Sequence, residues 1–316
     1  MKGQIRQFCV IVGDLEASME SYWSTFGIGP FQKNHFTPET SHDIYVKGKK
    51  VEEDYHFCCA CCWEGDMEYE LIRPYKGPNI YWDHLEAFGP GMHHFKVVIP
   101  DNDELKEYMN EMEEKGMKVL QTGWIDQDVH YYIDSYEKLG MVVEFGNGGA
   151  IRACTDFYPE DRNLPRPVSH QQNIRRISLV VDDLDKYQKN WEELMDVTGW
   201  KRERCSSDSA AAFEYKGKPV QGTSSFSRAR VYAGGIEIEL IQPEEGTSIY
   251  RDFLEKHGTG LFMITDVCTP EEFPETAERM KEAGMKISQL YQTGDCCECC
   301  FDTQDAFSVV IGLANA

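Results

Sequence analysis

The sequence lacks the features that mark nucleic-acid-binding and membrane proteins. Among its 316 residues, Lys and Arg number 32 against 54 Asp and Glu, which gives a formal charge of −22. A charge of this sign repels phosphate backbones and anionic lipid headgroups. No apolar run approaches the length that spans a bilayer, and the N-terminal residues lack the pattern of a secretory signal. We therefore expect a soluble, cytoplasmic protein that binds neither nucleic acid nor a membrane.

A disulfide framework is also missing, although cysteine is plentiful. Eight of the 12 cysteines lie in two clusters, Cys58-Cys59-Ala60-Cys61-Cys62 and Cys296-Cys297-Glu298-Cys299-Cys300. Secreted disulfide scaffolds are smaller and space their cysteines between loops. Both clusters have strand-like sequence, in which successive side chains point to opposite faces, so four thiols cannot converge on one ion without a bulge. We interpret them as buried or oligomer-facing thiols of a reducing cytosol.

The chain contains an internal duplication at a constant offset of 169 residues. The matching segments are Asp14-Leu15 with Asp183-Leu184, Glu70-Leu71-Ile72 with Glu239-Leu240-Ile241, and residues 77–91 with residues 246–260. So many identities in one register are not expected by chance. The duplication predicts two homologous modules, residues 1–150 and 173–316. Between them, residues 151–172 contain three prolines among charged residues, which predicts a linker.

Each module has the pattern of two successive βαβββ units. In the first half of module 1 we expect strands over residues 4–12, 42–46, 55–63 and 67–72, with a helix over 15–26 capped by Asp14. In the second half we expect strands over 93–99, 119–124, 130–133 and 141–145, with a helix over 104–115 that Gly116 ends. The predicted fold class is therefore α+β.

Four short motifs follow one another in module 1. They are Gln7-Phe8-Cys9-Val10-Ile11-Val12-Gly13-Asp14-Leu15-Glu16, Tyr69-Glu70-Leu71-Ile72-Arg73-Pro74, Gly91-Met92-His93-His94, and Ile133-Asp134 with Val142-Val143-Glu144. In this order and spacing they resemble the vicinal oxygen chelate superfamily, which includes glyoxalase I, methylmalonyl-CoA epimerase, extradiol dioxygenases and the fosfomycin and bleomycin resistance proteins. The resemblance covers both modules. It implies paired βαβββ units that curl into an open cup holding one divalent metal ion.

The resemblance implies one metal ligand in each motif, namely Gln7, Glu70, His93 and Glu144. Three oxygen donors and one imidazole suit Zn, Ni, Co or Mn, and leave positions for a small-molecule substrate that presents two neighbouring oxygens. Glu144 and Glu70 would serve as catalytic bases on opposite sides of this substrate. Taken singly, each residue is more often a rim side chain or a hydrogen-bonded histidine, so the prediction rests on their joint placement.

Module 2 is expected to be a metal-free copy. At the four ligand positions it has Arg176, Glu239, Phe262, and Ile311 or Gly312, depending on where a gap is placed. We expect the ring of Phe262 to fill the volume of the metal. If the two modules of one chain exchanged halves, neither site would be complete. Module 1 must therefore close on itself, or exchange halves with module 1 of a second chain in a homodimer.

The ligand set favours proton transfer over oxygen chemistry, because Gln7 stands where an extradiol dioxygenase needs a histidine. The set resembles some glyoxalase I enzymes, whereas the Gly91-Met92-His93-His94 strand is closer to methylmalonyl-CoA epimerase. We predict a metal-dependent isomerase of the epimerase or racemase type, acting at a carbon next to a carbonyl. A glyoxalase-type lyase and a non-catalytic small-molecule binding protein remain alternatives.

Three further residues are secondary pocket candidates. They are His94, Tyr131 and Tyr132. Strand alternation places His94 on the opposite face from His93, and the two tyrosines on opposite faces from each other.

Overall fold

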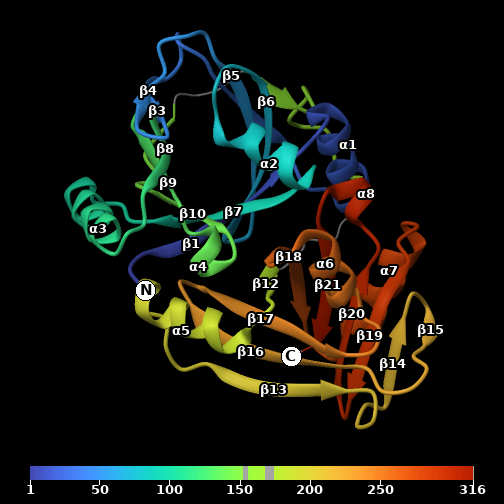
Figure 1. Ribbon diagram of the computed structural model, residues 1–316. Coiled ribbons are helices and arrows are strands. Elements are labelled where there is room, and N and C mark those ends of the chain that lie inside the picture. Colours follow the sequence, from blue (N-terminus) through green and yellow to red (C-terminus); the bar gives the residue numbers. More distant parts are fainter. Residues whose placement is uncertain (152–155, 168–173, 316) are drawn as a thin grey trace. The chain divides into compact units, whose positions relative to one another are not determined.

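The computed structural model describes residues 1–151, 156–167 and 174–315. The chain forms two compact units, Met1–Gln171 and Gln172–Ala316, drawn from blue to green and from yellow to red in Figure 1. Each unit contains one mixed β-sheet with helices packed on it. Among the described helices, none is both long and apolar enough to cross a bilayer.

Unit 1 has the predicted order of two βαβββ halves, with extra short elements. The first half contains β1 (Gln4–Ile11), α1 (Leu15–Phe26), β2 (Phe31–Phe36), β3 (His42–Val46), β4 (Lys49–Lys50), β5 (His56–Glu64) and β6 (Met67–Lys76). After α2 (Ile80–Phe88), the second half contains β7 (Gly91–Val98), α3 (Asn102–Glu114), β8 (Val119–Ile125), β9 (Asp128–Ile133), α4 (Tyr136–Leu139) and β10 (Val142–Gly146).

The segment expected as a linker contains a short strand, β11 (Phe157–Tyr158), which pairs with β2. The remainder of that segment includes residues 152–155 and 168–172, which lie outside the described residues.

The four motif-bearing strands lie side by side at the centre of the unit 1 sheet. Its order is β11-β2-β5-β6-β1-β7-β10-β9-β8-β3-β4. β1 runs parallel to β6, β7 runs parallel to β10, and the antiparallel pair β1–β7 joins the two halves. All four motifs therefore meet within unit 1 of one chain.

Alternation along these strands separates a helix-covered face from a polar face. Phe8 packs edge-on against Tyr69, with ring centroids 4.6 Å apart, and Tyr22 of α1 contacts Tyr69 from the helix side. Phe145 packs in the same way against Tyr108 of α3, at 5.2 Å. Because strand side chains alternate, the neighbours of these aromatic residues point away from the helices. Those neighbours include the predicted metal ligands of β1, β6 and β10.

Unit 2 repeats this architecture. Its elements are β12 (Ile174–Val180), α5 (Leu184–Met195), β13 (Lys201–Ser206), β14 (Ala212–Tyr215), β15 (Lys218–Pro219), β16 (Ser225–Ala233), β17 (Ile236–Glu245), α6 (Ile249–His257), β18 (Gly260–Cys268), α7 (Phe273–Glu282), β19 (Ile287–Thr293), β20 (Cys296–Phe301), α8 (Gln304–Phe307) and β21 (Val310–Asn315). The sheet order, β13-β16-β17-β12-β18-β21-β20-β19-β14-β15, matches that of unit 1 strand for strand once β11 is set aside.

Candidate metal centre

The polar face of the unit 1 sheet surrounds a cavity of about 190 Å³. Its lining includes Gln7 of β1, Glu68 and Glu70 of β6, Lys96 of β7, Glu144 of β10, and Asp128, His130 and Tyr132 of β9. We call this cavity and the buried side chains around it the unit 1 cup. Four carboxyl groups thus share one small space, which is costly unless cations accompany them.

Five buried side-chain atoms around the unit 1 cup have no hydrogen-bond partner among the described residues. They are Gln7 Oε1, Glu70 Oε2, His94 Nε2, Glu144 Oε2 and His130 Nε2. His94 Nε2 lies 2.9 Å from Glu144 Oε2 and 3.3 Å from Glu70 Oε2, so these atoms form an ion pair when the imidazole is protonated. Buried polar atoms are nearly always hydrogen-bonded, so this group of nitrogen and oxygen atoms in one cup is what ligands arranged for a cation would show.

The structure places His94, and not His93, among the carboxylates. Cys9 of β1 pairs with His94, while the next residue, Val10, pairs with Met92, so β7 bulges and His93 has no partner on β1. A bulge interrupts the alternation of side chains. The two imidazoles therefore touch, with their Nδ1 atoms 2.8 Å apart, instead of pointing to opposite faces as expected.

His93 lies behind His94 as its hydrogen-bond partner. Its ring contacts Tyr81 and His84 of α2, and burial lowers its pKa, so the imidazole is neutral. Metal-binding histidines usually anchor their second ring nitrogen in this way, which fixes the tautomer and the orientation of the ring. The contact with His93 therefore holds the His94 ring in its orientation.

The other predicted ligands have partners that orient them. Gln7 Nε2 donates to Glu68 Oε2 at 2.8 Å, which leaves Gln7 Oε1 directed into the cup. Lys96 Nζ lies 3.1 Å from Glu144 Oε1, which leaves Glu144 Oε2 for His94. Burial alone would raise the pKa of Glu144, but Lys96 and His94 outweigh it and hold the pKa near 2. Glu144 is therefore a permanent carboxylate, as a metal ligand must be.

Two further members of the unit 1 cup were absent from the sequence prediction. Cys9 is fully buried, and its Sγ lies with ligand atoms of Glu70 and His94 in a group that spans no more than 4.8 Å. Burial, reinforced by Glu70, raises the pKa of the Cys9 thiol. Lys96 is the second such residue. Cys9 lies two residues after Gln7 on β1, and Lys96 lies two residues after His94 on β7. Alternate residues of a strand share a face, so this spacing is the sequence signal that could have identified both.

Of the secondary candidates, Tyr132 lines the unit 1 cup and accepts a hydrogen bond from Tyr81 at 3.0 Å. Tyr131 is partly exposed and does not line it.

Two thiols of the first cysteine cluster, those of Cys59 and Cys61, line the cup. Cys58 and Cys62 are not among the lining residues, which agrees with the expectation that four thiols on one strand do not converge on one point.

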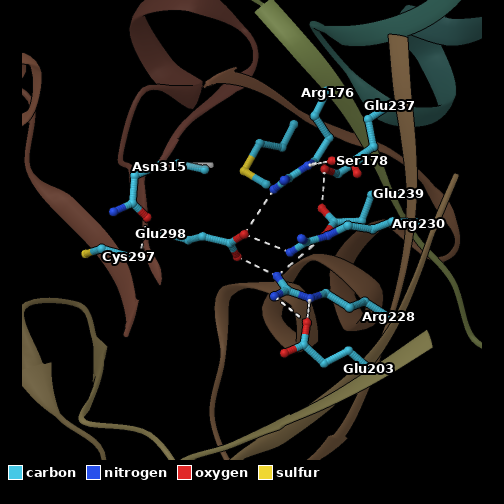
Figure 2. Close-up of polar contacts among 12 residues, drawn as sticks. Arg176, Ser178, Glu203, Arg228, Arg230, Glu237, Glu239, Cys297, Glu298 and Asn315 are labelled. Carbon is cyan, nitrogen blue, oxygen red and sulfur yellow. Dashed lines mark hydrogen bonds and ion pairs between the residues drawn. The ribbon is translucent and has the colours of Figure 1, made fainter. Parts of the chain in front are cut away.

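The equivalent cup of unit 2 is filled by ion pairs (Figure 2). By strand register, Arg176 stands at the position of Gln7, Glu239 at that of Glu70, Met263 at that of His94, and Gly312 at that of Glu144. The ambiguity between Ile311 and Gly312 is thereby resolved in favour of Gly312. Three of the four ligand types are therefore missing from unit 2.

Phe262 does not fill the volume of a metal, contrary to expectation. It is the counterpart of His93, and its ring packs against Tyr250 and Phe253 of α6. Three arginines take the central space instead. Arg176, Arg228 and Arg230 all bind the carboxylate of Glu298, as Figure 2 shows. Arg228 and Arg230 stand 169 residues after Cys59 and Cys61, so two thiols of unit 1 correspond to two guanidinium groups of unit 2.

The two cups differ in their buried permanent cations. In unit 2, three arginines face the carboxylates of Glu203, Glu237, Glu239 and Glu298. In unit 1, Lys96 is the buried permanent cation beside the carboxyl groups of Asp128 and Glu144, and His94 pairs with Glu70 and Glu144 only when its imidazole is protonated. Unit 2 thus carries more fixed positive charge in its cup than unit 1, and a divalent cation in unit 1 would reduce this difference.

The unit 2 network makes a pH-dependent contribution to stability. Burial alone would raise the pKa of Glu298, but Arg228, Arg230 and Arg176 outweigh it and lower the pKa from 4.5 to about 2. Because the pKa is lower in the folded state, this contribution is present above pH 4.5 and is lost as the pH falls towards 2. We expect the stability advantage of the wild type over Glu298→Gln, measured by urea denaturation, to shrink by roughly 3 kcal/mol over this window. A difference that stays constant with pH would contradict the assignment.

Comparisons with known proteins agree with this architecture. Residues 6–133 and 175–301 each match the family model described as the Glyoxalase/Bleomycin resistance protein/Dioxygenase superfamily. No functionally curated protein matches the chain in sequence.

Several solved structures share the fold over nearly the whole chain. A mutant 4-hydroxymandelate synthase from Streptomyces coelicolor is 10% identical, with 99% of this chain and 92% of that chain covered, at a TM-score of 0.62. The Mn(II)-bound glyoxalase from Novosphingobium aromaticivorans is 14% identical, with 99% and 82% covered, at 0.52. BphC, a halotolerant catechol dioxygenase, is 10% identical, with 100% and 87% covered, at 0.51. At these identities the likeness concerns the fold alone.

Proposed function

The chain belongs to the glyoxalase/bleomycin resistance protein/dioxygenase superfamily, and from this premise we propose that unit 1 is a metal-dependent isomerase of the epimerase or racemase type. In this proposal Gln7, Glu70, His94 and Glu144 hold one divalent ion. The reaction moves a proton at a carbon next to a carbonyl. Unit 2 is the metal-free copy.

One observation carries the metal assignment. Five buried side-chain atoms around the unit 1 cup have no hydrogen-bond partner among the described residues, and four of them belong to the proposed ligands. The charge deficit of this cup relative to its copy supports the same assignment. Three oxygen donors and one imidazole suit Zn, Ni, Co or Mn, and Gln7 stands where the two-histidine, one-carboxylate iron site of an extradiol dioxygenase needs a histidine.

The protein's own residues are arranged to handle a proton. When bound, a divalent ion supplies Lewis acidity that stabilises negative charge on the substrate oxygens. Glu70 on β6 and Glu144 on β10 reach His94 Nε2 from strands on either side of the β1–β7 pair. We assign to these two carboxylates the removal and return of the proton at opposite faces of the substrate. Lys96 holds Glu144 in place through its second oxygen.

The size of the cavity limits the substrate. A volume of about 190 Å³ accommodates a small molecule, or the reactive end of a larger one that enters through the mouth. The chemistry requires two neighbouring oxygens and an acidic C–H bond beside a carbonyl. Small 2-oxo acids, α-hydroxy ketones and acyl thioesters meet these requirements.

The test is solvent deuterium exchange, followed by NMR, into these three substrate classes with the metal-loaded protein. We expect metal-dependent exchange at the α-carbon of one class, and roughly a 100-fold or greater loss in Glu144→Gln, in line with the usual contribution of a general base. Glu137→Gln, an exposed carboxylate on the adjacent helix α4, should behave like the wild type. An α-proton that never exchanges in metal-loaded protein would exclude the isomerase and leave the lyase and the binding protein.

A further inference from the structure

Cys9 occupies the one position of β1 that faces both Glu70 and His94. By strand register it pairs with Glu70 of β6 on one side and with His94 of β7 on the other. Its side chain is fully buried, and its Sγ belongs with ligand atoms of those two residues to the 4.8 Å group. Glu70 Oε2 and His94 Nε2 lie 3.3 Å apart, and both are buried without a hydrogen-bond partner among the described residues.

The duplicated unit shows what a side chain at this position reaches. Ser178 is the counterpart of Cys9, and its Oγ donates to Glu239 Oε2 at 2.6 Å. Glu239 is neutralised by Arg230, whose Nε lies 2.7 Å away. In unit 1 the counterparts are Cys9, Glu70 and Cys61, and among the described residues the ion-pair partner of Glu70 is His94 instead of an arginine.

The two thiols that flank Glu70 are not equivalent. Cys61 Sγ lies 3.9 Å from Glu70 Oε1, where it can donate a weak hydrogen bond. Glu70 Oε2 is the oxygen that faces His94. Cys61 therefore contacts the oxygen of Glu70 that does not face His94, whereas Cys9 stands between Glu70 and His94 by strand register.

We propose that Cys9 is a further, thiolate ligand of the unit 1 ion, and that it makes the site prefer zinc and cobalt over manganese and magnesium. The inference rests on the proposed metal centre. On binding, the S–H bond breaks, the sulfur donates an electron pair to the ion, and the proton passes to solvent. Thiolate is a soft donor, and soft donors favour zinc and cobalt, whereas an oxygen-rich set without sulfur serves manganese equally well.

Cobalt(II) loading tests this in the full-length protein. We expect the wild type and Cys61→Ser to show both visible d–d bands and a near-ultraviolet thiolate-to-cobalt charge-transfer band. Cys9→Ser, which copies the residue of unit 2, should keep the d–d bands and lose the charge-transfer band. Its affinity for Zn should fall roughly 10-fold or more while its affinity for Mn changes little, because only the soft ligand is removed.

Zinc X-ray absorption on the wild type gives a measurement that needs no variant. A sulfur scatterer at about 2.3 Å is expected. Visible bands without a charge-transfer band, and zinc without sulfur, would overturn the thiolate ligand and leave the metal centre intact. A charge-transfer band that persists in Cys9→Ser would also overturn it. No cobalt spectrum at all would overturn the metal centre, and this inference with it.

Discussion

Replacing His94 by alanine should abolish binding of a divalent ion, and with it any metal-dependent proton exchange. His94 offers the only imidazole nitrogen that lies within 3.3 Å of both Glu70 and Glu144 in the described part of the chain. Loss of an outer partner of a metal ligand typically costs 10–100-fold in affinity, so loss of the ligand itself should exceed roughly 100-fold. Isothermal titration with Zn, and metal content after dialysis, measure this directly.

The neighbouring histidine supplies a graded control for this prediction. His93→Ala removes only the partner of His94 Nδ1, so we expect a loss of roughly 10–100-fold and retained stoichiometry. Met263→Leu, at the position of His94 in unit 2, should leave metal content unchanged. If His93→Ala lowered the affinity for Zn more than His94→Ala does, His93 would be the ligand instead of His94.

Replacing Arg228 by methionine should destabilise unit 2 by about 3–5 kcal/mol, the usual cost of removing one partner of a buried ion pair. The Arg228 side chain is only 6% exposed and binds the carboxylates of Glu203 and Glu298. Its removal leaves these carboxylates buried with fewer cations, which is expensive. Methionine keeps much of the volume, so the effect reports on charge more than on packing.

Arg204→Met is the matched control, because Arg204 lies on the neighbouring strand β13 and pairs with Glu244 while its own side chain is 54% exposed. Exposed pairs contribute at most about 1 kcal/mol. Hydrogen exchange under increasing urea, with peptides from both units followed separately, measures the two effects. Equal effects of the two replacements would show that the Arg228 network does not hold unit 2 together.

The fold was predictable because its signals are local and repeated. Helix α1 occupies the expected residues, since Asp14 accepts a hydrogen bond from the backbone N–H of Ala17 and Gly27 adopts the left-handed conformation that ends the helix. The strands that carry the motifs begin or end within a few residues of the expected bounds. The β2 strand, Phe31–Phe36, was not predicted, because its apolar residues are interrupted by Gln32, Lys33 and Asn34.

The site was predictable at three of its four proposed ligand positions, but the choice between His93 and His94 was not. That choice depends on a bulge, and a bulge is set by the pairing of β7 with β1, which no single segment encodes. Cys9 and Lys96 could not be predicted from the motifs, because each lies two places beyond a predicted ligand position or its neighbour, and neither is itself a predicted ligand position.

The content of the unit 2 cup was predictable only in part. Arg176 was recognised because it replaces a predicted ligand. Arg228 and Arg230 replace Cys59 and Cys61, which no motif marks as functional. Only the offset of 169 residues connects them with the cup of unit 1.

The location of a bound ion tests the central claim most directly. Crystals of the full chain grown with Zn or Mn, with diffraction recorded at the absorption edge of the metal, would reveal each ion by its anomalous signal. The account predicts one strong peak per chain, in unit 1 among Glu70, His94 and Glu144, and none in the arginine-filled cup of unit 2. A unit 1 cup without a peak at saturating metal, or a peak among Arg176, Arg228 and Glu298, would contradict it.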